Sequence, residues 1–252
     1  MTTKIGTLRN VTIDAPDHRA LGHFYRELTE ATIRADFDHW FVIMTPGGAK
    51  LGFQPVSDLR RSTWPSQEVA QQLHLDFLVN DLAAATAKAE SLGAKAVGGD
   101  GENFTVLTDL AGHPFCLCRN DQEEPITVFG VCLDSATATG LASFYAPLLG
   151  MGAQQVESDD AWISGDGPIA NVTFQQVTDY HPPRWPDPEH PQQMHLDILV
   201  DDIDVAHEQV VALGARPMPV VDEDADWRVY LDPADHPFCL VFMPKGYVPP
   251  AS

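Results

Sequence analysis

The chain of 252 residues carries 36 acidic side chains against 15 Lys and Arg, which gives a formal net charge of −21 and a pI near 4.5. This balance argues against nucleic acid or an anionic membrane surface as a partner, because both require Lys and Arg to neutralise phosphate. No apolar run approaches the roughly 20 residues that span a bilayer, and residues 1–5 lack the apolar core of a signal peptide. We therefore expect a cytoplasmic protein whose four cysteines, which form no CxxC pair, stay reduced.

The first 55 residues predict one strand, one helix and three further strands. Residues 8–15 alternate in polarity as a strand does, and Pro16-Asp17 ends them. Apolar side chains then recur at the spacing of one buried helical stripe, namely Leu21, Phe24, Tyr25 and Leu28. Three short strand-like runs follow, at 32–36, 40–45 and 50–55.

A long loop follows at residues 55–71 and contains the pair Trp64-Pro65. Loops of this length are usually functional or disordered. We expect the Trp to plug one end of its own domain, in preference to the alternative that it contacts a ligand.

The same order of elements then occurs again. A strand at 72–81 leads into a helix whose stripe is Leu82, Ala85, Ala89 and Leu92, and Gly93 ends that helix. Three more strands are predicted at 95–98, 104–108 and 114–119, with a turn at 109–113 that accounts for His113. Residues 1–119 therefore contain the unit βαβββ twice.

The second half of the chain repeats the first. Segment 72–81 (QLHLDFLVND) returns 121 residues later at 193–202 (QMHLDILVDD), and a Trp-Pro pair returns at Trp185-Pro186 in the loop 176–192. Both helical stripes return as well, as Leu141, Phe144, Tyr145 and Leu148 before Gly150, and as Ile203, Ala206, Val210 and Leu213 before Gly214. A repeat at this distance predicts two copies of one domain, 1–119 and 126–245, joined by a polar linker at 119–125. Since one curved sheet with one helix cannot bury both faces, we expect the two units of a copy to lie side by side and close a trough.

This pattern resembles the vicinal oxygen chelate superfamily, which includes glyoxalase I, extradiol dioxygenases and bleomycin resistance proteins. The resemblance is carried by paired βαβββ units, by the repeated His-Leu-Asp strand and by the runs 109–117 and 232–240, which contain His-Pro-Phe-Cys-Leu. It implies an α+β fold in which four βαβββ modules form two tandem glyoxalase-like domains.

In metal-using members of that superfamily, ligands come from the first and last strands of both units of a pair. The resemblance places these positions at Asn10, Gln54, His74 and Cys116 in the first copy, and at Gly130, Gln175, His195 and Cys239 in the second. Both copies have Cys where the superfamily has its terminal Glu. Because a Lewis-acid metal normally needs at least three good protein ligands, we expect no metal cofactor, with a divalent metal such as zinc as the alternative.

The His and Asp of the repeated strand lie two residues apart and so share one face. His74 and His195 are candidates for a general base or for orienting a ligand, and a structural role is equally consistent. Asp76 and Asp197 either fix the imidazole tautomer or form a salt bridge or cap, and we favour the second. Gly130, at the place of Asn10, makes the second copy the expected scaffold.

The remaining candidates are thiols and aromatic side chains. Cys116 and Cys239 are expected to be small core residues, and a nucleophilic thiolate is the alternative. The aromatic side chains that are expected to line the two cavities, or to be ordinary core, are Trp40, Phe104, Trp162 and Trp227. His236 resembles His113 in lying at a turn, and the acidic segment 222–226 is expected to be a solvated loop.

The function that these observations favour is binding of a small organic ligand without a catalytic metal. The alternative is a metal-dependent lyase, isomerase or dioxygenase that resembles glyoxalase I and uses His74 or His195. Because the two fused copies can satisfy each other's pairing surfaces, we expect a monomer or a weak homodimer.

Overall fold

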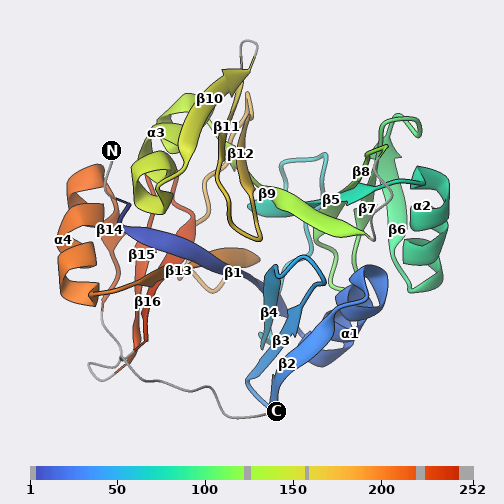
Figure 1. The fold of residues 1–252 in the computed structure, drawn as a ribbon, viewed down its shortest axis with the longest axis horizontal. Helices are drawn as coiled ribbons and strands as arrows, with labels where there is room; N and C mark the ends of the chain where they lie inside the picture. Colours follow the sequence, from blue (N-terminus) through green and yellow to red (C-terminus); the bar gives the residue numbers. More distant parts are fainter. Residues whose placement is uncertain (1–3, 122–125, 157–158, 220–224, 244–252) are drawn as a thin grey trace.

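The computed structural model describes residues 4–121, 126–156, 159–219 and 225–243, and it contains the βαβββ unit four times (Figure 1). The first two modules consist of β1 (Gly6–Ala15), α1 (His18–Thr29), β2 (Thr32–Phe37), β3 (Trp40–Met44) and β4 (Lys50–Pro55), then β5 (Leu73–Val79), α2 (Leu82–Ser91), β6 (Lys95–Gly99), β7 (Phe104–Thr108) and β8 (Pro114–Arg119). The third and fourth consist of β9 (Thr127–Ser135), α3 (Ala138–Leu149), β10 (Gly152–Val156), β11 (Asp160–Ser164) and β12 (Asn171–Gln176), then β13 (Met194–Val200), α4 (Ile203–Leu213), β14 (Arg216–Pro217), β15 (Trp227–Leu231) and β16 (Pro237–Phe242). The predicted α+β fold and its modules are confirmed. Among the described residues, no helix has the length and apolar character to cross a bilayer.

The helices begin and end where their side chains indicate. Asp17, Asp81 and Asp202 each accept a hydrogen bond from a backbone N–H in the first turn of the following helix. Gly150 and Gly214 end α3 and α4 in the left-handed conformation that glycine adopts without strain. The predicted apolar stripes face the interior, and the stripe of α1 is entirely buried.

The strands assemble into two eight-stranded mixed sheets. Sheet A has the order β14-β15-β16-β13-β1-β4-β3-β2, and sheet B has the order β10-β11-β12-β9-β5-β8-β7-β6. In Figure 1 the blue strand β1 runs between the blue strands β2–β4 and the orange-red strands β13–β16. The first module therefore shares a sheet with the fourth, and the second shares a sheet with the third.

This pairing corrects one sequence-based expectation. The two units of a copy do not close a trough together, because β1 pairs antiparallel with β13 of the other copy, and β5 pairs antiparallel with β9. Each sheet is thus completed across the two copies. The boundaries 1–119 and 126–245 remain predictions of the sequence repeat, and most of the linker, residues 122–125, lies outside the described residues.

The two modules of one copy are instead held together through their helices. The ring of Tyr25 on α1 stacks on Phe53 of sheet A, with centroids 5.8 Å apart, and on Phe77 of sheet B, 5.9 Å apart. Its hydroxyl donates to Asp109 at the turn between β7 and β8. Tyr145 on α3 repeats the arrangement, since it stacks on Phe174 and donates to Asp232. The core of each copy therefore lies between the two sheets, and their opposite faces carry the polar side chains described next.

Candidate ligand-binding sites

The face of sheet A that points away from the core carries a cluster of polar side chains. On β1, Asn10, Thr12 and Asp14 alternate with core-facing Val11 and Ile13. The register of β1 with β13 places Asn10 opposite Asp197 and Thr12 opposite His195. Gln54 on β4 lies beside Asp14, and Cys239 on β16 lies beside Asp197. We call these residues site A: Asn10, Thr12, Asp14, Gln54, His195, Asp197 and Cys239.

The central carboxylate of site A has three protein partners. Asp197 Oδ2 accepts from Asn10 Nδ2 at 2.5 Å and from Thr12 Oγ1 at 2.6 Å, and Asp197 Oδ1 lies 3.4 Å from His195 Nε2. Burial raises the pKa of Asp197, but His195 and these two donors outweigh burial and hold the pKa below its usual value.

The imidazole of His195 also has a partner at each nitrogen. Nε2 faces Asp197, and Nδ1 accepts from Gln192 Nε2 at 2.8 Å. Gln192 was absent from the sequence-based candidates, and the only signal for it was its place three residues before the His. Since both nitrogens are engaged, this ring has no free lone pair directed at a ligand.

Asp14 is the second buried carboxylate of the site. It accepts from Gln54 Nε2 at 2.7 Å and from Gln192 Nε2 at 3.0 Å. Burial nevertheless raises the pKa of Asp14 to about 6, because it outweighs the opposing effects of His195, Gln192 and Gln54.

This shift makes stability depend on pH in a defined direction. The folded protein binds the Asp14 proton more tightly than the unfolded chain, so the contribution of this group is complete below pH 3.8 and is lost as pH rises through about 6. We expect the free energy of unfolding of Asp14→Asn to rise by about 2–3 kcal/mol relative to the parent protein as pH rises from 3.8 to above 6. Urea unfolding of both proteins at a series of pH values measures this difference. Parallel pH profiles would contradict it.

Apolar side chains flank the polar floor of site A on both sides. Trp40, Val42 and Met44 on β3 are partly exposed on this face, whereas the alternate residues of that strand are buried in the core. On β15, Trp227 is 45% exposed and Val229 is partly exposed, and both lie on this same face. A Cβ at Gly52 would lie 2.9 Å from the ring of Trp40 and 3.1 Å from Thr12 Oγ1, so the indole lies over Gly52 next to the floor.

Sheet B carries the equivalent cluster, which we call site B: His74, Asp76, Cys116, Gly130, Cys132, Asp134 and Gln175. Two of its residues differ from site A in kind, because Gly130 replaces Asn10 and Cys132 replaces Thr12. A Cβ at Gly130 would lie 2.5 Å from the carbonyl oxygen of Asn171, so the approach of β12 leaves no room for a side chain there.

The hydrogen bonds of site B also differ from those of site A. His74 Nε2 lies 3.5 Å from Asp76 Oδ1, but His74 Nδ1 is buried and has no partner among the described residues. Gln71, which corresponds to Gln192, donates to both oxygens of Asp134, at 3.0 and 3.1 Å. The imidazole nitrogen that Gln192 occupies in site A is therefore left open in site B.

Electrostatics in site B favour the protonated form of this imidazole. Burial lowers the pKa of His74, but Cys132 and Asp76 outweigh it and raise the pKa well above its ordinary value. Burial raises the pKa of Cys132 to about 11, so the isolated thiol stays protonated at neutral pH.

Aromatic side chains lie on this face as well. Trp162 is partly buried on β11, and Phe104 is 39% exposed on β7. A Cβ at Gly98 would lie 3.2 Å from the ring of Trp64 and 3.8 Å from Val106, so the Trp of the first long loop packs onto the face that carries site B. The preferred interpretation, a Trp packed on its own domain, agrees with this contact.

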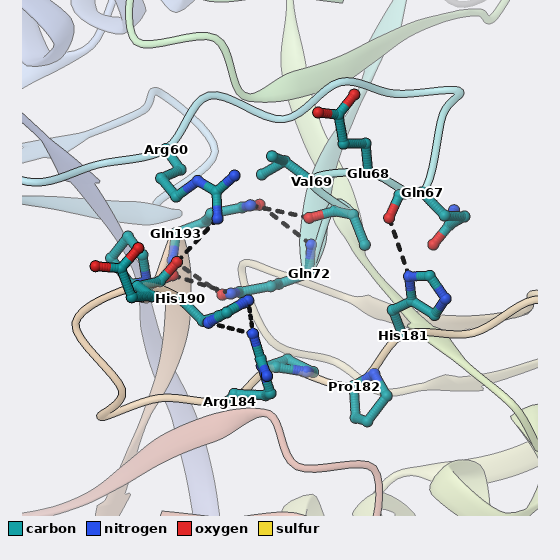
Figure 2. A pocket seen from close by; sticks show the side chains of 14 residues that line it. Arg60, Gln67, Glu68, Val69, Gln72, His181, Pro182, Arg184, His190 and Gln193 are labelled. Carbon is teal, nitrogen blue, oxygen red and sulfur yellow. Dashed lines mark hydrogen bonds between the residues drawn. The ribbon is translucent and has the colours of Figure 1, made fainter.

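A separate pocket of about 330 Å³ lies between the two long loops, and the residues that line it belong to neither site A nor site B (Figure 2). Gln72 and Gln193 join the two copies beside it, because each backbone N–H donates to the side-chain oxygen of the other, at 3.2 and 2.9 Å. Figure 2 shows Arg60 and His181 reaching from one loop to the other, where they bond the carbonyls of Glu189 and Gln67. The polar groups that line this pocket thus already hold the loops together.

The modules and their shared sheets define a protein of the vicinal oxygen chelate superfamily. The chain belongs to the glyoxalase-like domain family, whose sequence model matches residues 10–118 and 130–241. Glyoxalase I from Zea mays has a similar structure, with a TM-score of 0.63, 16% identity and coverage of 94% of this chain and 92% of that one. A proposed dioxygenase from Bacillus subtilis subsp. subtilis str. 168 gives a TM-score of 0.65 at 13% identity, over 96% and 86% of the two chains. No significant match was found among curated proteins.

The structure groups the predicted candidate residues by sheet, whereas the sequence analysis grouped them by copy. Site A and its walls contain Asn10, Trp40, Gln54, His195, Asp197, Trp227 and Cys239, whereas site B and its walls contain His74, Asp76, Phe104, Cys116, Trp162 and Gln175. The grouping of Asn10 and Gln54 with His74 was wrong, because these residues lie on different sheets. Thr12, Asp14, Cys132 and Asp134 were missed, although their period of two along the first strand of each copy was a usable signal.

The donors of site A do not fit a divalent metal at the superfamily's chelating positions. Asn10 and Gln54 direct their amide nitrogens at carboxylates, and both nitrogens of His195 already have protein partners. A metal there would have to break these buried bonds before it gained a ligand. Site B lacks a donor at Gly130, but it keeps the open nitrogen of His74.

Proposed function

We propose that this protein binds a small organic molecule on site A without a metal at the superfamily's chelating positions. The observation that carries the proposal is the division of this face into a buried polar floor on β1 and β13 and partly exposed apolar walls on β3 and β15. Ligand sites combine apolar and aromatic walls with a few convergent polar groups in this way. Hydrogen bonds within the protein already hold the polar groups of this floor in place, and the carboxylates keep acceptor sites that a ligand can use.

The charges of site A favour a neutral or cationic ligand that donates hydrogen bonds. Asp14 and Asp197 are its formal anions, and His195 is its one titratable base. The net charge of −21 adds a long-range field that repels anions. Trp40 and Trp227 suit a flat or cationic group, because indole faces attract both.

A metal-dependent lyase, isomerase or dioxygenase is the second candidate function. Nδ1 of His74 favours it, because this buried nitrogen has no hydrogen-bond partner in the described part of the chain and is available as a ligand. In that case the reaction would take place in site B and would leave site A as a supporting surface.

Thermal-shift screening of a library of small neutral and cationic compounds tests the first proposal. We expect some compounds to raise the melting temperature of the EDTA-dialysed protein, because binding to the folded state stabilises it. Trp40→Ala is expected to weaken their binding at least about tenfold, since the ring supplies one wall of the site.

Phe104→Ala is the matched control, because Phe104 lies at the wall of site B on the other sheet. Its effect on binding is expected to be small. The proposal fails if compounds stabilise the untreated protein but none stabilises the EDTA-dialysed protein, or if Trp40→Ala binds as well as the parent protein. The proposal includes a cytoplasmic monomer or weak dimer, and light scattering that shows an obligate tetramer would contradict the assembly.

A further inference from the structure

Site B brings three metal-binding side chains together in the protein interior. One nitrogen of His74, Cys132 Sγ and one oxygen of Asp134 all lie within 4.8 Å of one another, and all three residues are buried. Ligand atoms around a tetrahedral zinc ion are about 3.3–3.8 Å apart, given metal–ligand distances of about 2.0–2.3 Å. Small side-chain rotations therefore suffice to close the set around one ion.

The second observation is the open nitrogen of His74. Its Nδ1 has no partner among the described residues, although His74 is only 7% exposed. Its Nε2 lies 3.5 Å from the carboxylate of Asp76. Histidines that bind metals usually present one nitrogen to the ion and give the other N–H to a carboxylate, which fixes the tautomer and the ring orientation. His74 already has the second half of this arrangement.

Site A shows that the fold does not require these features. At the equivalent places it has Thr12 instead of a thiol and Gln192 bonded to the imidazole Nδ1. Gln71 instead donates to both oxygens of Asp134, one of which lies within 4.8 Å of a His74 nitrogen. The thiol and the free nitrogen occur together in one site of two, which indicates a specific use for site B.

We propose that site B binds one zinc ion through His74 Nδ1, Cys132 Sγ and the carboxylate of Asp134, with a fourth position open toward Gln175. A thiolate and an imidazole select zinc over magnesium and calcium, which prefer oxygen ligands only. Two of the three ligands, Cys132 and Asp134, lie two and four residues beyond the superfamily's position at Gly130. This inference concerns sheet B and does not rest on the function proposed for site A.

Metal titration of the full-length protein tests the inference. After dialysis against EDTA and then against metal-free buffer, calorimetry with Zn²⁺ is expected to show one tight site per chain. Co²⁺ as a spectroscopic probe is expected to give a thiolate-to-cobalt charge-transfer band. Cys132→Thr introduces the residue that site A carries at the same place, so we expect the fold to tolerate it. This variant is expected to lose the band and to bind Zn²⁺ about 10- to 100-fold more weakly.

Cys239→Ser is the matched control, because it removes the thiol of site A and is expected to change neither the band nor the affinity. Absence of a stoichiometric site in the parent protein would overturn the inference. It would also be overturned if Cys132→Thr kept the band while Cys116→Ser lost it, since the ion would then lie between His74, Asp76 and Cys116. Binding of an organic compound to site A is measured separately, so failure of one proposal leaves the other intact.

Discussion

Replacing Asp109 with alanine is expected to lower the free energy of unfolding by about 3–5 kcal/mol, because this buried carboxylate is an acceptor for five donors. Its Oδ1 accepts from the backbone N–H groups of residues 111, 112 and 113, and its Oδ2 accepts from Tyr25 and contacts His113 Nδ1. The Tyr25 bond ties the helix of the first module to the turn of the second. Alanine would leave four of these donors buried without this acceptor, whereas the N–H of Gly112 would keep its bond to the backbone carbonyl of residue 109. Chemical denaturation measures the loss.

Asp100→Ala is the control for this prediction. Asp100 also accepts from three successive backbone N–H groups, those of Glu102, Asn103 and Phe104, but it is exposed. Water replaces the lost acceptor there, so we expect a clearly smaller effect. Equal losses in the two variants would show that the turn alone, and not its burial, accounts for the stability.

The carboxylate of Asp109 also makes the stability of the protein depend on pH. Burial raises the pKa of Asp109, but His113 and the other donors outweigh burial and hold it below the usual 3.8. A lowered pKa in the folded state adds stability that is complete above pH 3.8 and is lost as pH falls through the folded-state value. The difference between parent protein and Asp109→Ala should therefore stay constant above that pH and shrink in stronger acid.

Gly22→Ala in α1 is expected to lower the free energy of unfolding by about 1–3 kcal/mol. The same change in an exposed helix raises that free energy by up to about 1 kcal/mol. A Cβ at Gly22 would overlap the ring of Phe41 and would lie 3.2 Å from the ring of Phe53. Both rings are buried in the core, so neither can move aside without opening a void. Thermal or chemical unfolding of the variant measures the cost.

Gly140→Ala in α3 is the control, because a Cβ there would meet only the side chain of Thr137, at 3.3 Å, and the position is exposed. We expect this variant to be as stable as the parent protein or slightly more stable. If both alanine variants gained stability, the packing of α1 against β3 would be looser than the structure shows.

The sequence alone determined the modules of this protein and the face on which each strand residue lies. The repeat of 121 residues, the apolar stripes at helical spacing and the alternation along 72–81 are local patterns, and each follows from the geometry of one helix or one strand. The same patterns identified each His and the Asp two residues after it as neighbours on one strand face, and the His–Asp distances of 3.5 and 3.4 Å in the structure agree with this.

Only the tertiary structure decided which modules share a sheet, and therefore which residues share a site. The edge of β1 offers the same row of backbone donors and acceptors to β5 as to β13, so no local pattern distinguishes the two pairings. The choice depends on how α1 and Tyr25 pack between the sheets, which involves residues more than 80 positions apart, such as Asp109. Across the pairing of β1 with β13, Gln192 bonds both Asp14 and His195, whereas Gln71 bonds Asp134 and leaves Nδ1 of His74 without a partner among the described residues. This difference separates the two sites chemically.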